Sequence, residues 1–178
     1  MSIIFRIYLT LNALFLVFVV FAIKDNIYFK FFYTESYVLP SYISFGGYFI
    51  FSLLSTKFGL YLSNYLSEDS IDKGSIISIE PANDSFLPSY LGYFFVALSI
   101  PNLETFYWVF SVVSIFIFYS KLSYFNPIYF IFGYKFYYII NSNQVKVLLI
   151  TKKEIKIPKD IEFPTIKRIN NYTFIEKG

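Results

Sequence analysis

The chain has 178 residues, of which 56% are hydrophobic, 24% aromatic and only 15% charged, and its formal net charge is +3. Its mean hydropathy of +0.54 is too high for an ordinary soluble domain of this length, so the composition indicates a membrane protein. The absence of cysteine and histidine excludes disulfides, thiol nucleophiles, thiolate metal sites and histidine proton shuttles.

The first predicted membrane span covers residues 3–23 and supplies about 20 apolar residues, the number that a hydrocarbon core requires. This run is longer than the apolar core of a typical signal peptide, and no small-x-small cleavage site follows it, so we expect it to stay in the protein. A loop over residues 24–41 separates it from the second predicted span, residues 42–65.

An acidic insertion, residues 66–87, follows the second span and must lie in water. Its charged residues are five acids and one base: Glu68, Asp69, Asp72, Glu80, Asp84 and Lys73. Within it, the short β-branched stretch "SIISI" at residues 75–79 predicts a strand.

Two closely spaced apolar segments, residues 88–102 and 106–122, predict a tight helical hairpin with Glu104 at its tip. The first is short for a full crossing, so local thinning of the bilayer or burial between neighbouring helices would have to accommodate it. The sequence therefore predicts an α-helical four-span transmembrane bundle over residues 1–122.

The tail, residues 123–178, predicts a small strand-rich domain. Asn126-Pro127 ends any helix that continues from the fourth span. The runs at 134–140 and 145–151 flank a polar turn and predict a β-hairpin. Shorter strand-like pieces follow at 155–157, 161–163 and 172–176, with Pro158 and Pro164 between them.

The basic residues set the expected orientation. Ten of the 15 lie from Lys121 onward, and positive charge is retained on the cytoplasmic side of a membrane. We therefore expect the tail, the N-terminus and the acidic insertion to be cytoplasmic, although Lys24 and Lys30 argue mildly against this.

The insertion and the tail carry opposite charge, so we expect "SIISI" to join the tail's sheet with charge pairs at its rim. Exposed pairs of this kind contribute at most about 1 kcal/mol each, so they would orient the module without holding it together. The alternative is that both segments are simply solvated. The residues expected to contact a partner are Glu68, Asp69, Asp72, Lys152, Lys153, Lys167 and Arg168.

Polar residues within the predicted spans are candidate functional positions. We expect Asn12 to make an interhelical hydrogen bond and Lys57 to extend its ammonium toward the headgroups. Small residues recur in the second span at Ser55, Gly59 and Ser63, with a second pair at Ser52 and Thr56, and such stripes favour close helix packing within the chain or between copies.

No catalytic set, cofactor site or phosphate loop is evident, so we expect the protein not to be an enzyme. A two-carboxylate site at Glu80 and Asp84 is the weak exception. A channel lined by Asn12, Lys57 and the serines of the second span is an alternative function, and a small transporter or membrane enzyme is a third. The basic tail favours lipid headgroups over nucleic acid.

Four stretches carry a resemblance to a known family: "EPANDSFLPSYLGYFFVALSIPN" (80–102), "YFNPIYFIFGYKFYYI" (124–139), "LLITKK" (148–153) and "IKRINNYTFIE" (166–176). They resemble the KwaA family, the membrane subunit of the Kiwa antiphage defence system of bacteria. The resemblance implies a non-enzymatic inner-membrane protein that forms homo-oligomers, expected to be tetramers. It further implies sensing of phage attack at the envelope and binding of a cytoplasmic DNA-binding partner, KwaB.

Overall fold

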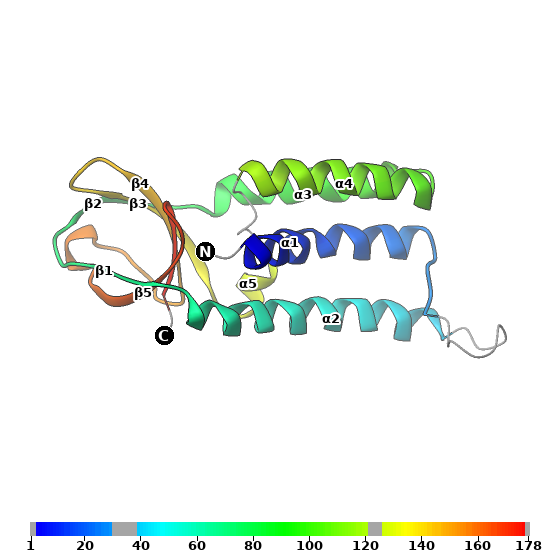
Figure 1. Ribbon diagram of the computed structural model, residues 1–178, viewed down its shortest axis with the longest axis horizontal. Helices are drawn as coiled ribbons and strands as arrows, with labels where there is room; N and C mark the ends of the chain where they lie inside the picture. Colours follow the sequence, from blue (N-terminus) through cyan, green and yellow to red (C-terminus); the bar gives the residue numbers. More distant parts are fainter. Residues whose placement is uncertain (1–2, 30–38, 121–125, 177–178) are drawn as a thin grey trace. The chain divides into compact units, whose positions relative to one another are not determined.

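The computed structural model describes residues 3–29, 39–120 and 126–176 (Figure 1). The chain divides into two compact units. Among the described residues, the helical unit comprises residues 3–29, 39–58, 89–120 and 126, and the sheet unit comprises residues 59–88 and 127–176. Both units are therefore discontinuous in sequence.

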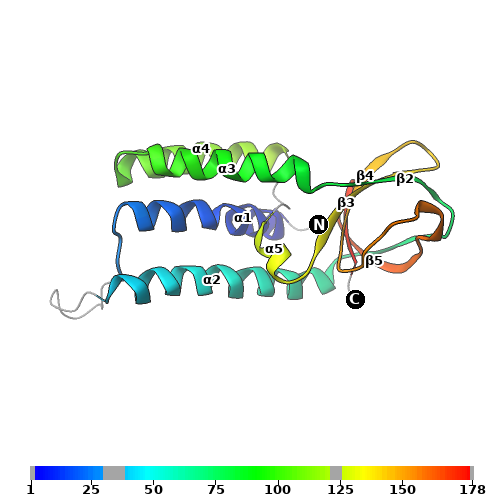
Figure 2. The ribbon, with the colours of Figure 1, turned by 180° about the vertical axis from the view of Figure 1, so that it is seen from behind.

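Four long helices are present in the described residues: α1 (Ile3–Lys24), α2 (Ser41–Leu62), α3 (Asn83–Ser99) and α4 (Leu103–Ser120). They run side by side in both ribbon views (Figures 1 and 2). By length and composition, three described stretches can cross a membrane, namely Ile3–Lys24, Ser41–Tyr65 and Leu103–Ser120. The expectation of membrane-spanning helices is met for these three, while the crossing by α3 stays a prediction.

Helix α3 falls short because its apolar part is only Tyr90–Ser99, although the helix itself begins at Asn83. Pro88 lies inside the helix, within its second turn. Helix α4 begins earlier than expected, at Leu103, so Glu104 lies in its first turn and not in the connecting loop. A carboxylate at that position is favoured by the positive end of the helix dipole.

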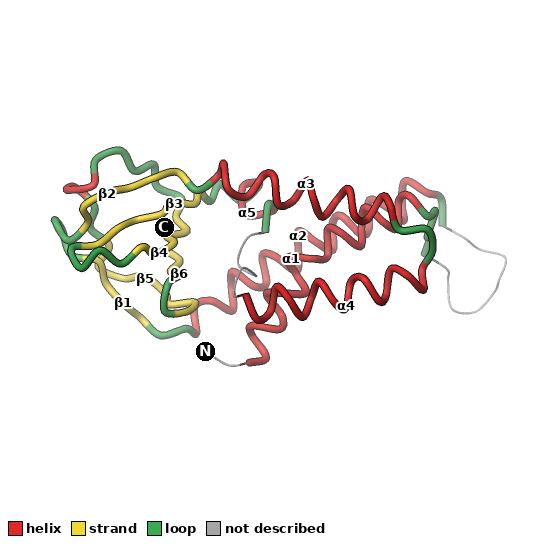
Figure 3. Tube along the Cα trace, turned by 90° about the horizontal axis from the view of Figure 1, so that it is seen from above, coloured by secondary structure: helices red, strands yellow, loops and turns green. Residues whose placement is uncertain are grey.

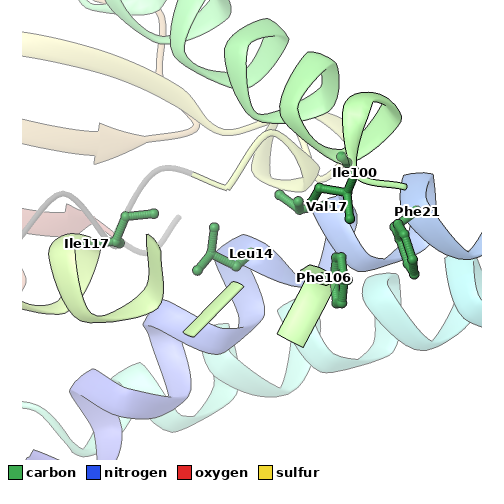
Figure 4. Packing of buried hydrophobic residues seen from close by; sticks show 7 residues of the cluster. Leu14, Val17, Phe21, Ile100, Phe106 and Ile117 are labelled. Carbon is green, nitrogen blue, oxygen red and sulfur yellow. The ribbon is translucent and has the colours of Figure 1, made fainter. Parts of the chain in front are cut away.

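Side chains of α1 form the centre of the helical unit. Leu14, Val17 and Phe21 pack against Ile100, Phe106 and Ile117 of the α3–α4 hairpin (Figure 4). The rings of Phe21 and Phe106 stack with their centroids 4.3 Å apart. Because lipid tails are as apolar as these side chains, close dispersion contacts of this kind drive helix association in a bilayer. On the α2 side, Phe18 meets Tyr48 edge to face, with centroids 5.5 Å apart.

The strands described in the sheet unit form one six-stranded sheet in the order β1-β5-β6-β4-β3-β2 (Figure 3). Their bounds are β1 (Glu68–Ile71), β2 (Ile76–Pro81), β3 (Lys135–Asn141), β4 (Lys146–Thr151), β5 (Phe163–Asn170) and β6 (Thr173–Glu176). β4 and β6 pair in parallel, and the other neighbouring strands are antiparallel. Short helices α5 (Ile128–Ile131), η1 (Ser63–Tyr65) and η2 (Pro158–Asp160) accompany the sheet.

The predicted hairpin is confirmed as β3 and β4, with Tyr137 opposite Leu149. Its turn places Gln144 at φ +60°, and the side-chain oxygen of Asn141 accepts from the backbone N–H groups of Asn143 and Val145. An asparagine that binds backbone groups ahead of it in this way is typical of a tight polar turn.

The acidic insertion supplies both edges of the sheet. The predicted strand at 75–79 is confirmed as β2, which pairs with β3. A second strand, β1, pairs with β5 at the other edge and was not predicted. The insertion is therefore a pair of edge strands that leads directly into α3, and it is not a free loop.

Both faces of the central strands are covered. On one face, Ile139, Leu149 and Ile166 belong to an apolar cluster. On the other, Phe136 stacks on Tyr129 of α5, with ring centroids 6.0 Å apart. Strands buried on both faces read as continuous apolar runs, which explains why this part of the tail resembles a membrane segment in composition.

Three expectations about the tail are wrong, and a fourth lies outside the described residues. Residues 155–157 form no strand. Of the piece expected at 161–163 only Phe163 lies in a strand, because β5 begins there and runs through Pro164 to Asn170, so Pro164 does not separate two strands. Pro164 precedes Ile166, the first β5 residue paired with β6, so its missing N–H is not needed there. The predicted boundary between helices and tail at residues 122–123 lies outside the described residues.

Candidate functional site: a buried polar cluster and a charged sheet surface

A buried polar cluster joins three segments of the helical unit. The side-chain amides of Asn12 in α1 and Asn126 both donate to the hydroxyl oxygen of Thr56 in α2, at 3.2 and 2.9 Å. The Asn126 amide also lies 3.5 Å from the backbone carbonyl of Asn12. The three side chains are buried, with 5%, 3% and 0% of their surface exposed for Asn12, Asn126 and Thr56.

This cluster fixes the point at which the chain leaves the helices, because Asn126 immediately precedes Pro127, where the sheet unit resumes. The carbonyl oxygen of the Asn12 side chain has no hydrogen-bond partner among the described residues. A buried acceptor without a partner lowers the free energy of unfolding, so the cluster combines two favourable hydrogen bonds with one unfavourable unpaired oxygen.

The sequence predicted the interhelical hydrogen bond of Asn12, and the structure shows it. It did not identify the partners. Thr56 was recognised only as a small residue, and Asn126 only as the residue before a helix-breaking proline. An asparagine within the aromatic stretch 124–132 was the available signal that a buried hydrogen bond is formed there.

The small-residue stripe of α2 makes contacts within the chain. Tyr8 of α1 donates its hydroxyl to the backbone carbonyl of Ser55 and lies 3.0 Å from the Ser55 hydroxyl. Ser63 is buried and donates to the Leu60 carbonyl at 2.7 Å, and Gly59 is buried as well. The contact of Ser55 with α1 supports close packing within the chain, while the expected packing role of Gly59 and Ser63, and any role between copies, stays a prediction.

Lys57 is exposed and forms no ion pair with any described residue. It precedes the end of α2 at Leu62 by about 7.5 Å of helix, at a rise of 1.5 Å per residue. A lysine stem can cover most of that length, and the expected extension toward the headgroups stays a prediction. Arg6 behaves differently, since it donates to the Phe118 carbonyl near the end of α4 at 3.1 Å. A cation suits that negative helix end.

Charge pairs link the insertion to the tail on the surface of the sheet. Glu68 of β1 pairs with Lys167 of β5 at 2.8 Å, and Glu80 of β2 pairs with Lys146 of β4 at 3.1 Å. The hydrogen bond from Lys167, followed by its positive charge, lowers the pKa of Glu68 below its ordinary value. The predicted pairing of acidic insertion and basic tail is thus present at these two positions.

Glu176 is a buried carboxylate that sequence reasoning missed. It accepts a hydrogen bond from the Thr151 hydroxyl and an ion pair from Lys153 at 2.7 Å. Burial, followed by the negative charge of Glu176, raises the pKa of Tyr134. Its position near the end of the chain gave no sign of burial, because the parallel pairing of β6 with β4 creates it.

The remaining expected contact residues are exposed on the sheet unit. Lys152 lies over the ring of Tyr134, 5.1 Å from its centroid, and Arg168 donates to the Asn171 side chain at 3.1 Å. Asp69 and Asp72 form no ion pair with any residue in the described ranges. Lys153 and Lys167 are already engaged by carboxylates, so the four residues Asp69, Asp72, Lys152 and Arg168 present the freer charges.

These features define a membrane protein in which a helical unit continues into a mixed sheet assembled from two separate stretches of chain. The family model described as anti-phage protein KwaA matches residues 5–175. The chain belongs to this family of anti-phage defence proteins, as the resemblance in its sequence indicated. No curated protein and no solved structure matches it.

Replacing Thr56 by valine tests the polar cluster. Valine keeps the shape but removes the shared acceptor, so the amides of Asn12 and Asn126 lose their partner in a buried environment. We expect a loss of about 1–3 kcal/mol in the free energy of unfolding, measured in detergent micelles. The matched control is Ser111→Ala, because Ser111 is exposed and bonds only to the Tyr107 carbonyl of its own helix. Equal stability of the two variants would contradict the account.

The ion pair between Glu68 and Lys167 predicts a titration. The pKa of Glu68 is lower in the folded protein than in the unfolded chain, so the ion pair stabilises the fold at pH values above the pKa of Glu68 in the unfolded chain. This stabilisation is lost as the pH falls through the pKa of Glu68 in the folded protein. In carboxyl-resolved NMR of the full chain, Glu68 should titrate below the ordinary glutamate range. In Lys167→Met it should return toward that range, whereas Lys73→Met should leave it unchanged. A Glu68 pKa that ignores Lys167 would refute this assignment.

Proposed function

We propose that this protein is a non-enzymatic, membrane-embedded sensor and scaffold subunit of a bacterial antiphage defence complex, Kiwa. In this proposal it lies in the inner membrane with both termini in the cytoplasm, oligomerises as a tetramer, and engages the cytoplasmic DNA-binding protein KwaB. Membership of the anti-phage family supports the defence role. The observation that supports the scaffold role is the folded sheet unit. Of the three candidate spans it includes only the last residues, 59–65, of Ser41–Tyr65.

The pairing of strands supports a four-span topology. β2 precedes α3 and α4 in the chain, and β3 follows them, yet the two strands are hydrogen-bonded to each other. Both must lie on the same side of the bilayer, so the chain between them crosses an even number of times. If α4 crosses, then α3 must cross as well. If α1 and α2 both cross as well, these two crossings place the N-terminus on the same side of the bilayer as the sheet.

The side that carries the sheet is proposed to be the cytoplasm. The tail carries most of the chain's basic residues, and charge of this sign is retained there. Of the expected contact residues, Asp69, Asp72, Lys152 and Arg168 form no ion pair with any described residue and are available to a soluble partner. Exposed aromatic side chains on α4, including Trp108 and Phe116, are available to lipid or to another copy of the chain.

The topology is testable because the chain has no native cysteine. Single variants Lys73→Cys, in the β1–β2 turn, and Glu104→Cys, at the start of α4, place thiols at two exposed positions. In intact spheroplasts a membrane-impermeant maleimide should label only Glu104→Cys, and Lys73→Cys should react after permeabilisation. Lys152→Cys is the matched control for the tail and should behave like Lys73→Cys. Equal labelling of Lys73→Cys and Glu104→Cys would overturn the four-span proposal.

The scaffold role predicts loss of partner binding without loss of insertion. We expect the full chain to co-purify with a soluble protein of its defence system and to reduce phage plating. The variant Lys152→Glu with Arg168→Glu should still insert but should lose both properties, because it reverses two exposed charges. The control, Lys73→Glu with Lys156→Glu, reverses two exposed charges elsewhere and should retain both. Retention of partner binding and phage defence by the Lys152→Glu, Arg168→Glu variant would contradict the proposal. A conductance of the full chain in planar bilayers that is lost in Lys57→Ala would support a pore instead.

A further inference from the structure

The sheet unit contains a cavity of about 350 Å³ to which all six strands or their turns contribute. Its walls include the edge strands β1 and β2, the turn that joins them, the turn of the β3–β4 hairpin and Asn171 between β5 and β6. This volume lies at the small end of the range for pockets that bind small ligands, so it fits one or two side chains and not a whole folded element.

The floor of the cavity is apolar. Ile139, Val147, Ile166 and Phe174 line it, and they come from the four inner strands β3, β4, β5 and β6. Ile139 lies opposite Val147 in the ladder, so both side chains belong to the same face. These residues form or adjoin the apolar cluster of the sheet, and therefore the floor is held in place by the core. Such a floor favours an aliphatic side chain.

The rim of the cavity is acidic. Asp69 and Asp72 line it, and no lysine or arginine does. Two other acidic residues of the insertion, Glu68 and Glu80, are already paired with Lys167 and Lys146, as shown by distances of 2.8 and 3.1 Å. Asp69 and Asp72 instead make only local polar contacts in the described structure, such as the 2.9 Å bond from the Ser70 amide to the Asp69 carboxylate. The rim therefore retains two negative charges.

Two bases, Lys73 and Arg168, lie near this rim, and neither lines the cavity in the described structure. Lys73 follows Asp72 but does not line the cavity. Arg168 donates to Asn171 at 3.1 Å and forms no ion pair with Asp69 or Asp72. A second cavity, of about 310 Å³, is bordered by Lys153, Lys156 and three carboxylates, so its charges favour no ligand of one sign.

We propose that the acid-rimmed cavity binds an extended basic segment of a protein partner, with an aliphatic side chain on the apolar floor and flanking lysines or arginines at Asp69 and Asp72. In an extended segment, every second side chain points to the same face, so a basic-x-aliphatic-x-basic pattern presents all three groups together. Anionic lipids and nucleic acid carry the wrong charge for this rim. The inference rests on the proposed function in one respect, namely that the occupant belongs to a protein partner.

The test uses the full chain in nanodiscs of zwitterionic lipid and a fluorescein-labelled synthetic peptide, Ser-Lys-Ser-Ile-Ser-Lys-Ser, with binding followed by fluorescence anisotropy. We expect the peptide to bind, and to bind more weakly when salt is raised, because the rim is exposed to solvent. Two comparison peptides separate the two parts of the site. One replaces both lysines by glutamate and the other replaces isoleucine by serine, and both should bind more weakly.

The protein variants test the rim directly. Asp69→Asn with Asp72→Asn keeps shape and removes both charges, and it should weaken binding about tenfold at low salt. The matched control, Asp160→Asn with Glu162→Gln, removes two exposed acids that do not line this cavity and should leave binding unchanged. Unaltered far-UV circular dichroism of each variant shows that the sheet is retained.

The inference is overturned if the lysine peptide does not bind, if the glutamate peptide binds equally well, or if the Asp69→Asn, Asp72→Asn variant binds like the control. Failure of the proposed function has a different signature. If the peptide results are as expected but no soluble protein co-purifies with the full chain, then the chemistry of the cavity stands and the scaffold role falls. If a partner co-purifies while the peptide fails to bind, then only the cavity assignment falls.

Discussion

Hydrogen bonding between the acidic insertion and the tail is the constraint on which the rest of the protein depends. β1 and β2 come from the insertion, and their only sheet neighbours among the described strands, β5 and β3, come from the tail. A backbone ladder cannot form across a bilayer, because its groups must meet within a single aqueous compartment or a single protein interior. The sheet therefore joins the stretch of chain between α2 and α3 to the stretch that follows α4.

Local patterns predicted the parts of the sheet that form locally. The β3–β4 hairpin carries its turn chemistry at residues 141–144, and "SIISI" is apolar and β-branched between polar neighbours. The strand order was not predictable in the same way. The parallel pairing of β6 with β4 and the pairing of β1 with β5 join residues that lie far apart in the sequence, and β1 is a short acidic stretch without a strand-like pattern. Such pairings depend on the packing of the whole core, as the burial of Ile166 and Leu149 illustrates.

The candidate sites likewise combine features that the local sequence predicts with features that depend on segments distant in the chain. The energetics of a bilayer were enough to predict that Asn12 needs a hydrogen-bond partner within the protein. They could not identify Thr56 or Asn126, because both are distant in sequence. Thr56 lies 44 positions after Asn12, and Asn126 lies 70 positions after Thr56. Opposite net charges predicted pairing between insertion and tail, and Glu68 with Lys167 bears this out. Glu176 was beyond such reasoning, since its burial follows from the position of β6 inside the sheet.

In the helical unit, apolar contacts supply most of the stability, and a few hydrogen bonds fix how the helices are arranged. Interhelical hydrogen bonds in membrane proteins average only about 0.6 kcal/mol each, so the two bonds to Thr56 add little net stability when made, although removing their acceptor leaves two buried amides unpaired and costs more. The apolar contacts around Phe21 and Phe106 are far more extensive, but they are non-directional and tolerate small shifts between helices. The polar cluster does not tolerate such shifts, because Thr56 offers one hydroxyl oxygen to two amides. It therefore specifies how α1 and α2 meet, and since Asn126 is one of the two donors, the same geometry specifies where the chain departs toward the sheet unit.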